Sequence, residues 1–344
     1  MEVMRLARRA DDHRLQLLRG TAWRDITELC SELETEDEIN TLSVRASFTL
    51  DVNPRDRYLP QVDAVVGDRV RIVNAATGGE VFSGIITADD VRGSYTAHDP
   101  GWWLGKSDLV FQCSGARADS AIERLCAKAG VPVGHIPSMT QQVTDIWTGE
   151  TFARILEDIL EVVSTATGRQ FLFRIEGGRF WLRDLPDEVT TLQHKPADNV
   201  AAFDPTWALG QLSGGRKLDD LRNAVTVVRK EGDTVYVAAQ AESAASITRF
   251  GRIGQVLTLT DDMTGSPQSI AQAALDAADR LAGEYTVEMY GDDQVKSGRI
   301  IAFASGTFGL AGKYRVQNVT HRYGRPHRMT VTVAPVDVPR AAEA

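Results

Sequence analysis

The stretch Thr41-Leu42-Ser43-Val44-Arg45-Ala46-Ser47-Phe48-Thr49-Leu50 alternates polar and apolar side chains without interruption. Because successive side chains of a β-strand point to opposite faces, this period of two predicts a half-buried strand with one wet face. Asn53-Pro54-Arg55-Asp56 then breaks the pattern with residues that are typical of turns. The amino-terminal part of the chain is therefore expected to be built from β-structure.

A similar pattern continues beyond this break. Residues 68–73 and 81–86 flank Gly78-Gly79, an arrangement that is typical of a β-hairpin. Further strands are expected near residues 94–97 and 109–114. Antiparallel strands of this kind close into a small barrel or sandwich, so we expect the first domain to have one of these forms.

Two helices and a hairpin are expected in the middle of the chain. The first helix is followed by Gly130, a residue that commonly stops a helix. The second follows Thr148, with Glu150 in its first turn, where the helix dipole favours negative charge, and Gly168 just past its end. Residues 170–185 then form a hairpin. The apolar faces of the two helices consist of Ala118, Ala121, Ile122, Leu125 and Ala129, and of Phe152, Ile155, Leu156, Ile159, Leu160 and Val163.

The last third of the chain returns to β-structure, interrupted by one helix. Residues 223–230 and 234–239 flank Glu231-Gly232-Asp233, another hairpin signature. The helix is expected to begin after Ser266, a good N-cap that is followed by proline, and to be capped at its far end by Gly283. The strands expected after it are residues 285–290, 296–304, 314–320 and 328–334.

These elements predict an α+β fold that is mainly β, with two tube-like antiparallel β-barrel or sandwich domains and an inserted α+β unit. The first β domain is expected at residues 1–115 and the inserted unit, with two helices and a hairpin, at residues 116–200. The second β domain, with one helix, is expected at residues 201–338, and residues 339–344 are expected to form a flexible tail.

The composition excludes several classes of protein. Of the 344 residues, 43% are hydrophobic and 25% are charged, as in soluble globular proteins. No apolar run reaches the roughly 20 residues that a membrane crossing needs. Residues 1–19 are charged throughout and lack the apolar core of a signal peptide, so export by a standard route is not expected. The net charge of -9 disfavours a sequence-reading nucleic-acid binder, but it would suit a surface along which DNA slides.

A search for catalytic or metal-binding motifs predicts no catalytic residue, no cofactor and no metal. The chain has no GxSxG elbow and no phosphate-binding loop. His321 and His327 flank a turn and could approach across a hairpin, but no carboxylate or third ligand lies near them in the sequence. We interpret the acidic run at residues 32–38 as a solvated face or loop. The cysteines are expected to be reduced, buried thiols, and the aspartate pairs to form local hydrogen bonds beside turns: Cys30, Cys113 and Cys126, and Asp89-Asp90, Asp219-Asp220, Asp261-Asp262 and Asp292-Asp293.

The pair Trp102-Trp103, with Gly101 and Gly105 on either side, is the main candidate for a binding residue set. Tryptophan is enriched at protein interfaces, so we favour a subunit contact or a loop that plugs a core. A platform that stacks against a sugar or a partner is the alternative. The other four tryptophans are interpreted as core anchors: Trp23, Trp147, Trp181 and Trp207.

The order of several motifs resembles the baseplate hub family known from a defective Bacillus prophage, which is related to the T4-like hub and late control D group. Residues 95–107, with Tyr-x-Ala-x-Asp-Pro at their start, resemble a strand exit of that family. As in the family, a helix ending in Cys-x-x-x-Gly-Val-Pro follows, here at residues 122–132. Residues 221–227, 250–253 and 314–321 resemble later segments, although Phe250 stands where the family has tyrosine and Trp102-Trp103 is bulkier than is usual there.

The resemblance implies a structural protein of a contractile, myophage-type tail, and no enzyme. It implies a homotrimer in which each subunit supplies two tube-like domains, so that six domains form a pseudo-hexameric ring. Such a ring adapts the hexameric tail tube protein to the trimeric central spike protein, contacts other baseplate proteins, and lets DNA pass through its lumen without specific binding. The expected location is the tail baseplate of the virion, after assembly in the host cytoplasm, with no membrane segment.

Two other functions stay open at this point. One is a carbohydrate- or protein-binding β module of a tail, which would use Trp102-Trp103. The other is a tail-associated cell-wall hydrolase, which would need two carboxylates held in a cleft. The parent particle could be an infectious phage, a bacteriocin or another contractile injection system.

Overall fold

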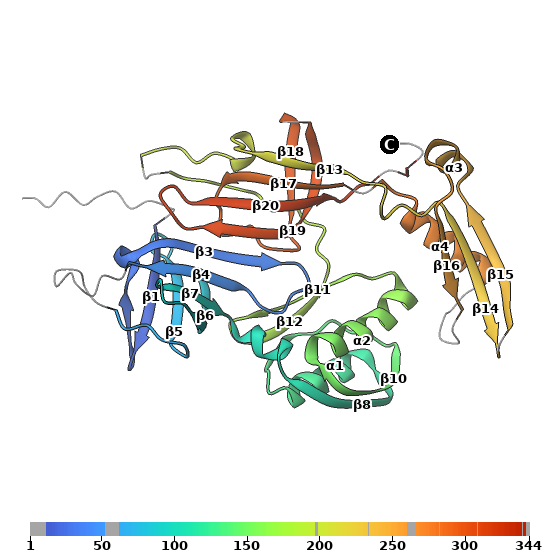
Figure 1. Ribbon diagram of the computed structural model, residues 1–344, viewed down its shortest axis with the longest axis horizontal. Helices are drawn as coiled ribbons and strands as arrows, with labels where there is room; N and C mark the ends of the chain where they lie inside the picture. Colours follow the sequence, from blue (N-terminus) through green and yellow to red (C-terminus); the bar gives the residue numbers. More distant parts are fainter. Residues whose placement is uncertain are drawn as a thin grey trace, which may run out of the picture. The chain divides into compact units, whose positions relative to one another are not determined.

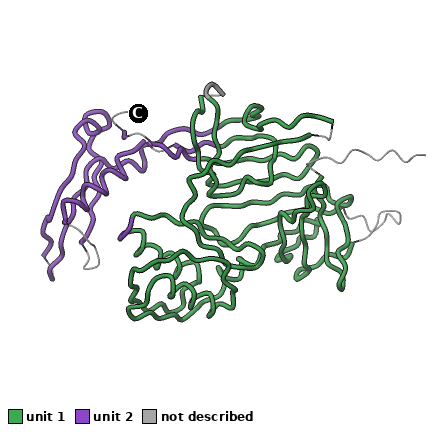
Figure 2. The backbone as a smooth tube through the Cα atoms, turned by 180° about the vertical axis from the view of Figure 1, so that it is seen from behind, with its two compact units in different colours: residues 1–164, 168–212, 286–333 green, residues 165–167, 213–285, 334–344 purple. Residues whose placement is uncertain are grey.

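The computed structural model describes residues 12–51, 62–196, 199–232, 234–259, 266–281, 283–307, 309–338 and 340–341 (Figure 1). The chain divides into two compact units (Figure 2). Unit 1 comprises residues 1–164, 168–212 and 286–333, and unit 2 comprises residues 165–167, 213–285 and 334–344. This division by compactness leaves the three-domain organisation expected from the sequence as a prediction. The turn predicted at residues 53–56 lies outside the described residues.

The main sheet of unit 1 is antiparallel and contains strands from both ends of the chain (Figure 1). The strand order is β13-β17-β20-β19-β3-β4-β7-β6-β5-β1-β2, with β13 (Leu212–Arg216) at one edge, and β18 pairs with β19 outside this path. The short helix η1 (Thr27–Leu29) lies between the second and third strands. The strands are β1 (His13–Arg19), β2 (Ala22–Asp25), β3 (Cys30–Glu38), β4 (Arg45–Leu50), β5 (Arg69–Asn74), β6 (Glu80–Asp89), β7 (Ser94–His98), β17 (Gly283–Tyr290), β18 (Ile300–Thr307), β19 (Leu310–Arg322) and β20 (Arg328–Pro335).

Strands β3 and β19 join the amino-terminal and carboxy-terminal strands into one sheet. Their antiparallel register runs from Glu38 opposite Asn318 to Glu34 opposite Arg322. The prediction of a mainly β fold with some helices is confirmed. The described strands follow an open path, and the tube-like barrel or sandwich form of the two β domains stays a prediction. Alternation along one strand predicts its two faces and says nothing of which distant strand its edge will meet.

The acidic run at residues 32–38 lies within β3, so the prediction of a loop there is wrong. Leu33, Thr35 and Asp37 are buried, whereas Glu34 and Glu36 on the other face are half-buried. The run therefore presents one acidic face while it supplies the pairing edge for β19. The many acidic residues obscured this strand in the sequence, although buried and half-buried residues alternate regularly from Leu33 to Asp37.

The predicted hairpin around Gly78-Gly79 is confirmed as β5 and β6. Alternate residues of these and the neighbouring strands point into one apolar core, as the period of two requires. This core includes Leu15, Leu17, Leu33, Ala46, Phe48, Leu50, Val70, Ile72, Phe82, Ile86 and Ala97.

The middle of the chain adds two helices and a hairpin to unit 1, as predicted, and further strands complete two small sheets. The helices bury their apolar faces against these sheets in a second core that contains Ile122, Phe152, Ile159 and Phe180. The short helix η2 (Pro100–Gly105) leads into this region. Its elements are β8 (Asp108–Arg117), α1 (Ala118–Lys128), β9 (Val133–His135), β10 (Gln142–Thr151), α2 (Phe152–Thr167), β11 (Phe171–Glu176) and β12 (Arg179–Asp184).

Helix α2 begins later than the sequence predicted. Thr151 is its N-cap and accepts a hydrogen bond from the backbone N–H of Arg154. Glu150 belongs to β10, which pairs with β8 as far as Thr151, so its predicted place in the first helical turn is wrong. The predicted end is confirmed: Gly168 has φ of 70° and caps the helix in the left-handed conformation that glycine adopts easily.

Unit 2 contains the sheet β15-β14-β16 with helix α4 on one face. The predicted hairpin of β14 and β15 is confirmed, and Ser266 caps α4 as predicted. The helix ends at Ala278 with Asp279 as its cap, while Gly283 starts β17, so the predicted role of Gly283 is wrong. The elements are β13 (Leu212–Arg216), β14 (Ala224–Glu231), β15 (Thr234–Glu242), α3 (Ala244–Phe250), β16 (Gly254–Thr258) and α4 (Pro267–Ala278).

Among the described residues, no helix combines the length and the apolar character that a membrane crossing would require. The cysteines Cys30, Cys113 and Cys126 are free thiols. Cys113 and Cys126 are buried as predicted, while Cys30 is only half-buried.

Candidate functional site

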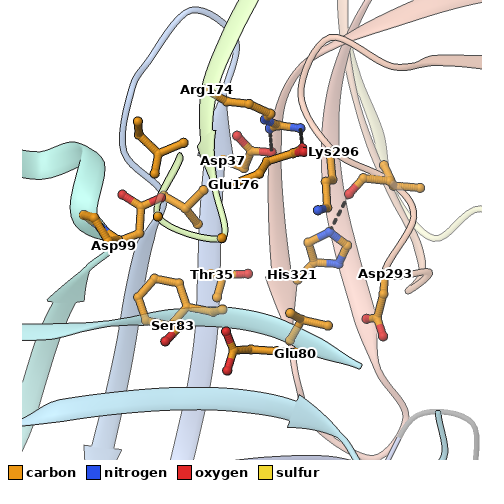
Figure 3. Close-up of a pocket in the computed structure, with 18 of the residues that line it drawn as sticks. Thr35, Asp37, Glu80, Ser83, Asp99, Arg174, Glu176, Asp293, Lys296 and His321 are labelled. Atoms are coloured by element: carbon orange, nitrogen blue, oxygen red, sulfur yellow. Dashed lines mark hydrogen bonds and ion pairs between the residues drawn. The ribbon is translucent and has the colours of Figure 1, made fainter. Parts of the chain in front are cut away.

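A polar cavity of about 640 Å³ lies in unit 1 where three parts of the chain meet (Figure 3). Strands β3 and β6 contribute Asp37 and Glu80, and the hairpin β11–β12 contributes Arg174. The loop after β17 contributes Asp293, and β19 contributes His321. The cavity therefore forms only when the amino-terminal strands, the middle of the chain and the carboxy-terminal strands have come together.

A buried ion pair forms one wall of this cavity. The guanidinium of Arg174 donates to Oδ2 of Asp37 at 2.7 Å, and both side chains are only 12% exposed. Ser297 adds two further bonds to Asp37, from its backbone N–H at 3.0 Å and from its hydroxyl at 2.8 Å. The Asp37 carboxylate thus links β3, β11 and the loop between β17 and β18.

A second polar group, which we call the histidine cluster, comprises His13, Asp293, His321 and His327. His13 Nε2 lies 2.9 Å and 3.0 Å from the two carboxylate oxygens of Asp293. The amide of Asn74 donates to Oδ2 of Asp293 at 2.7 Å. These contacts bring the first residue of β1 to the loop after β17, across 280 positions of sequence.

The other two histidines extend the cluster towards the turn before β20. Nδ1 of His321 lies 3.1 Å from Nε2 of His327, and Nε2 of His321 lies 2.9 Å from the carbonyl oxygen of Val295. Nδ1 of His327 lies 3.8 Å from Oδ1 of Asp293. The Tyr323 ring packs against His13 and His327 at centroid distances of 4.5 and 5.0 Å.

Burial changes the pKa values of three residues in the histidine cluster, Asp293, His321 and His327. It lowers the pKa of His327, and the neighbouring His321 and His13 lower it further, to about 2. It also lowers the pKa of His321. Burial raises the pKa of Asp293, but the hydrogen bond and charge of His13 outweigh it and bring that pKa to about 2. At neutral pH the cluster therefore has an ionised carboxylate beside the neutral rings of His321 and His327.

Three of these residues have the donor atoms and the spacing to hold a metal ion. One ligand atom from each of His13, Asp293 and His327 lies within 4.8 Å of the other two. The predicted approach of His321 and His327 is confirmed, but no sequence pattern indicated that His13 or Asp293 would be their neighbours. Of the pair predicted to bond locally, Asp292 does so with the backbone N–H of Gln294, whereas Asp293 bonds to His13.

The tryptophan pair lies on η2, which the surrounding residues hold tightly. Asp99 caps the turn by accepting from the backbone N–H of Gly101 at 3.0 Å. Trp102 stacks on His98 with a centroid distance of 5.6 Å, and Trp103 packs edge-on against Trp102 and remains 38% exposed. An interface role for Trp102 and Trp103 stays a prediction.

The predicted core role of the other tryptophans holds only in part. Trp147 is buried in the core of the middle region as predicted. Trp207 is 70% exposed, so its predicted core role is wrong. Trp23 and Trp181 are partly buried, and an arginine guanidinium lies over each ring, that of Arg71 and that of Arg183.

Comparison with known proteins identifies the family of this chain. The family model described as YQBQ-like matches residues 35–334. The chain belongs to the YQBQ-like family. This YQBQ-like protein is 24% identical over 264 residues to the phage-like element PBSX protein XkdQ of Bacillus subtilis (strain 168), covering 74% of this chain and 78% of XkdQ. The predicted resemblance to prophage tail proteins is confirmed.

Two solved structures share the fold at low sequence identity. The tail protein from Neisseria meningitidis MC58 matches the YQBQ-like chain with a TM-score of 0.64 and 13% identity, over 94% of this chain and 97% of that one. A chain of the lidded Francisella PdpA-VgrG complex matches with a TM-score of 0.50 and 9% identity, over 95% of this chain and 53% of that one.

Proposed function

We propose that this protein is a structural component of a contractile phage tail or tail-like injection particle, in which three copies form the baseplate hub. The trimer forms a pseudo-hexameric ring that adapts the hexameric tail tube to the trimeric central spike. The observation that carries the proposal is the likeness to the Neisseria tail protein, which extends over 94% of this chain with a TM-score of 0.64. Membership of the YQBQ-like family supports it.

In this proposal the β-rich segments at residues 1–115 and 201–338 supply the two tube-like parts, and residues 116–200 are the insertion. The pairing of β3 with β19 supports a stiff connection within unit 1, because its backbone hydrogen bonds fix the register of the two strands. A ring that transmits force between a tube and a spike needs such stiffness.

The contacts between copies are proposed at two exposed apolar surfaces. One is Trp103 on η2, which a neighbouring subunit would cover. The other is the face of the unit 2 sheet opposite α4, where the strand register places Val237 and Val256, 62% and 67% exposed. A second copy of this chain is the occupant we propose for both.

The remaining partners follow from the same proposal. The tail tube protein binds one side of the ring, the central spike protein binds the other, and further baseplate proteins surround it. The likeness to a chain of a PdpA-VgrG complex supports a spike-facing role. The net charge of -9 is consistent with a lumen that repels DNA phosphates and lets DNA pass without specific binding.

Light scattering coupled to size exclusion, at micromolar concentration, tests the assembly. A trimer has three times the mass of the 37.6 kDa chain, about 113 kDa. The double variant Trp102→Ala/Trp103→Ala is expected to shift the population towards monomer, whereas Trp207→Ala, which removes a more exposed tryptophan elsewhere in unit 1, is expected to leave it unchanged. A wild-type chain that is strictly monomeric, with no ring in assembled particles, would contradict the proposal.

The same variants distinguish the alternative of a carbohydrate- or protein-binding module, which the partial exposure of Trp103 favours over other non-hub functions. Loss of binding to a glycan array with assembly intact would support that module. Loss of assembly with no glycan binding in the wild type supports the hub.

A further inference from the structure

We propose that His13, Asp293 and His327 bind a divalent transition-metal ion of the zinc class, and that this ion clasps β1 to the loops that flank β18 and β20. Zinc binds imidazole nitrogens and carboxylate oxygens in a tetrahedral arrangement, and this set offers two of the first and one of the second. The proposal concerns the fold of unit 1 and is independent of the assembly proposed above.

The spacing of the donor atoms fits such an ion. Bonds of about 2.0–2.2 Å in a tetrahedron place neighbouring donor atoms roughly 3.4 Å apart. His13 Nε2 and Asp293 Oδ1 are 2.9 Å apart, and His327 Nδ1 and Asp293 Oδ1 are 3.8 Å apart. These two distances lie on either side of the expected value, and all three donor atoms lie within 4.8 Å of one another, so binding an ion requires small side-chain shifts.

The hydrogen bonds around the cluster orient the His327 ring with Nε2 towards His321 and Nδ1 towards Asp293. The carbonyl of Val295 can only accept, so Nε2 of His321 carries the proton and Nδ1 of this neutral ring accepts. His327 then donates from Nε2 to His321, and Nδ1 is the ring nitrogen on the Asp293 side. That Nδ1 is the atom 3.8 Å from the Asp293 carboxylate.

This orientation matches the outer contacts of known metal sites, where a ligating histidine donates its other N–H to an acceptor that holds the ring in place. Here His321 and the Val295 carbonyl hold His327, and the Asn74 amide, 2.7 Å from Oδ2, holds the Asp293 carboxylate.

The backbone also accommodates the His327 ring closely. A Cβ atom at Gly291 would lie 2.3 Å from this ring, so the position of His327 depends on glycine there. The side chains of His13 and His327 are 1% and 2% exposed, while that of Asp293 is 24% exposed and lines the polar cavity (Figure 3). The cavity gives an ion a path to the site and leaves room for water as a fourth ligand.

The experiment uses the full chain without added histidines, stripped with a chelator and then titrated with Zn²⁺ while heat and melting temperature are recorded. One ion per chain is expected, with a rise in melting temperature of about 5 °C when Zn²⁺ exceeds its Kd a hundredfold. Co²⁺ in place of Zn²⁺ is expected to give the strong visible absorption of a tetrahedral site.

The matched variants are His327→Gln, Asp293→Asn and His98→Gln, the last removing a histidine of unit 1 that lies outside the cluster and bonds to Thr87. The first two are expected to lose the visible absorption and the thermal shift, and the third to keep both. If His327→Gln does not fold, the test of the metal site depends on the Co²⁺ spectrum of the wild type and on the loss of that absorption in Asp293→Asn. A wild-type chain whose melting temperature does not respond to Zn²⁺, or cluster variants that retain the Co²⁺ absorption, would overturn the site and leave a network of hydrogen bonds only.

Discussion

Gly101 shows how closely the η2 loop is fitted to its surroundings at the scale of single residues. A Cβ atom there would lie 1.8 Å from the backbone oxygen of Leu42. Gly101→Ala is therefore expected to lower the free energy of unfolding by roughly 3 kcal/mol, because backbone has to move to admit a methyl group. Gly105→Ala is the control, since no atom lies within 4 Å of its Cβ position. Equal urea midpoints for the two variants would contradict this account.

Asp99, two residues earlier, makes stability depend on pH. Burial raises the pKa of this carboxyl to about 6, although the hydrogen bond from Gly101 opposes the shift. The unfolded value is about 3.9. A raised folded pKa contributes stability that is complete below pH 3.9 and is lost as pH rises through 6, here about 3 kcal/mol.

The measurement is the free energy of urea unfolding of the wild type and Asp99→Asn between pH 4 and 7. The wild-type curve is expected to fall relative to the variant as pH rises, because asparagine does not ionise. Only 7% of the Asp99 residue is exposed, so solvent screening should be small. Parallel curves would show that Asp99 titrates normally.

The histidine cluster illustrates what the sequence could predict of the site. Six positions separate His321 from His327, and a local turn was enough to predict their approach. His13 and Asp293 are 280 positions apart, and only the pairing of distant strands brings them together. No local pattern carries that information, which is why a set of three ligands went unrecognised.

At the scale of elements, the start of α2 can be tested directly. Thr151 accepts a hydrogen bond at 3.3 Å from the backbone N–H of Arg154. Thr151→Ala is expected to lower the free energy of unfolding by about 1 kcal/mol, because one helical N–H loses its acceptor. Thr151→Ser keeps the hydroxyl and is expected to retain most of that stability. Thermal unfolding followed by circular dichroism compares the two, and an equal loss in both would argue against the cap.

Periodicity predicted elements well and their ends poorly. The apolar face of α2 was predicted completely, since Phe152, Ile155 and Val163 follow helical spacing and are all buried. Its start was misplaced because Thr148 and Thr151 are equally good caps in sequence, and only the pairing of β10 with β8 selects the second. Similarly, Gly283 resembles a helix stop but is the first residue of β17.

At the scale of the whole molecule, the Arg174–Asp37 pair connects the middle of the chain to β3. Arg174→Met is expected to lower the free energy of unfolding by about 3 kcal/mol, because it leaves a buried carboxylate with only the Ser297 bonds. Adding Asp37→Asn is expected to cost less in this background than in the wild type, since the two residues are coupled.

Arg322→Met is the matched control for that pair. Arg322 bonds to Glu34 at 2.8 Å between β19 and β3, but the two side chains are 56% and 40% exposed. Its loss is expected to cost under about 1 kcal/mol. Urea unfolding of five chains provides all the comparisons: the wild type, Arg174→Met, Asp37→Asn, the double variant and Arg322→Met. Additive losses for Arg174 and Asp37 would exclude coupling.

The largest difference between expectation and structure is also at this scale. The strands were predicted as two separate sets, whereas β3 and β19 make them parts of one sheet. Alternation at residues 41–50 gives the buried face of β4, and the same alternation fits any partner strand. The sequence therefore predicted which residues form strands, but it did not predict which distant strands pair.

The pairing of β3 with β19 has a consequence for synthesis on the ribosome. β3 ends at Glu38 and β19 ends at Arg322, so β3 emerges about 280 residues before its partner. At a synthesis rate of 5–20 residues per second, the edge of β3 that pairs with β19 stays unpaired for roughly 15–55 seconds in the nascent chain. Uncovered strand edges promote aggregation, and charged side chains counteract it. The glutamates of β3 are therefore expected to limit aggregation of the growing polypeptide with its neighbours on the same polysome until the final strands have been made.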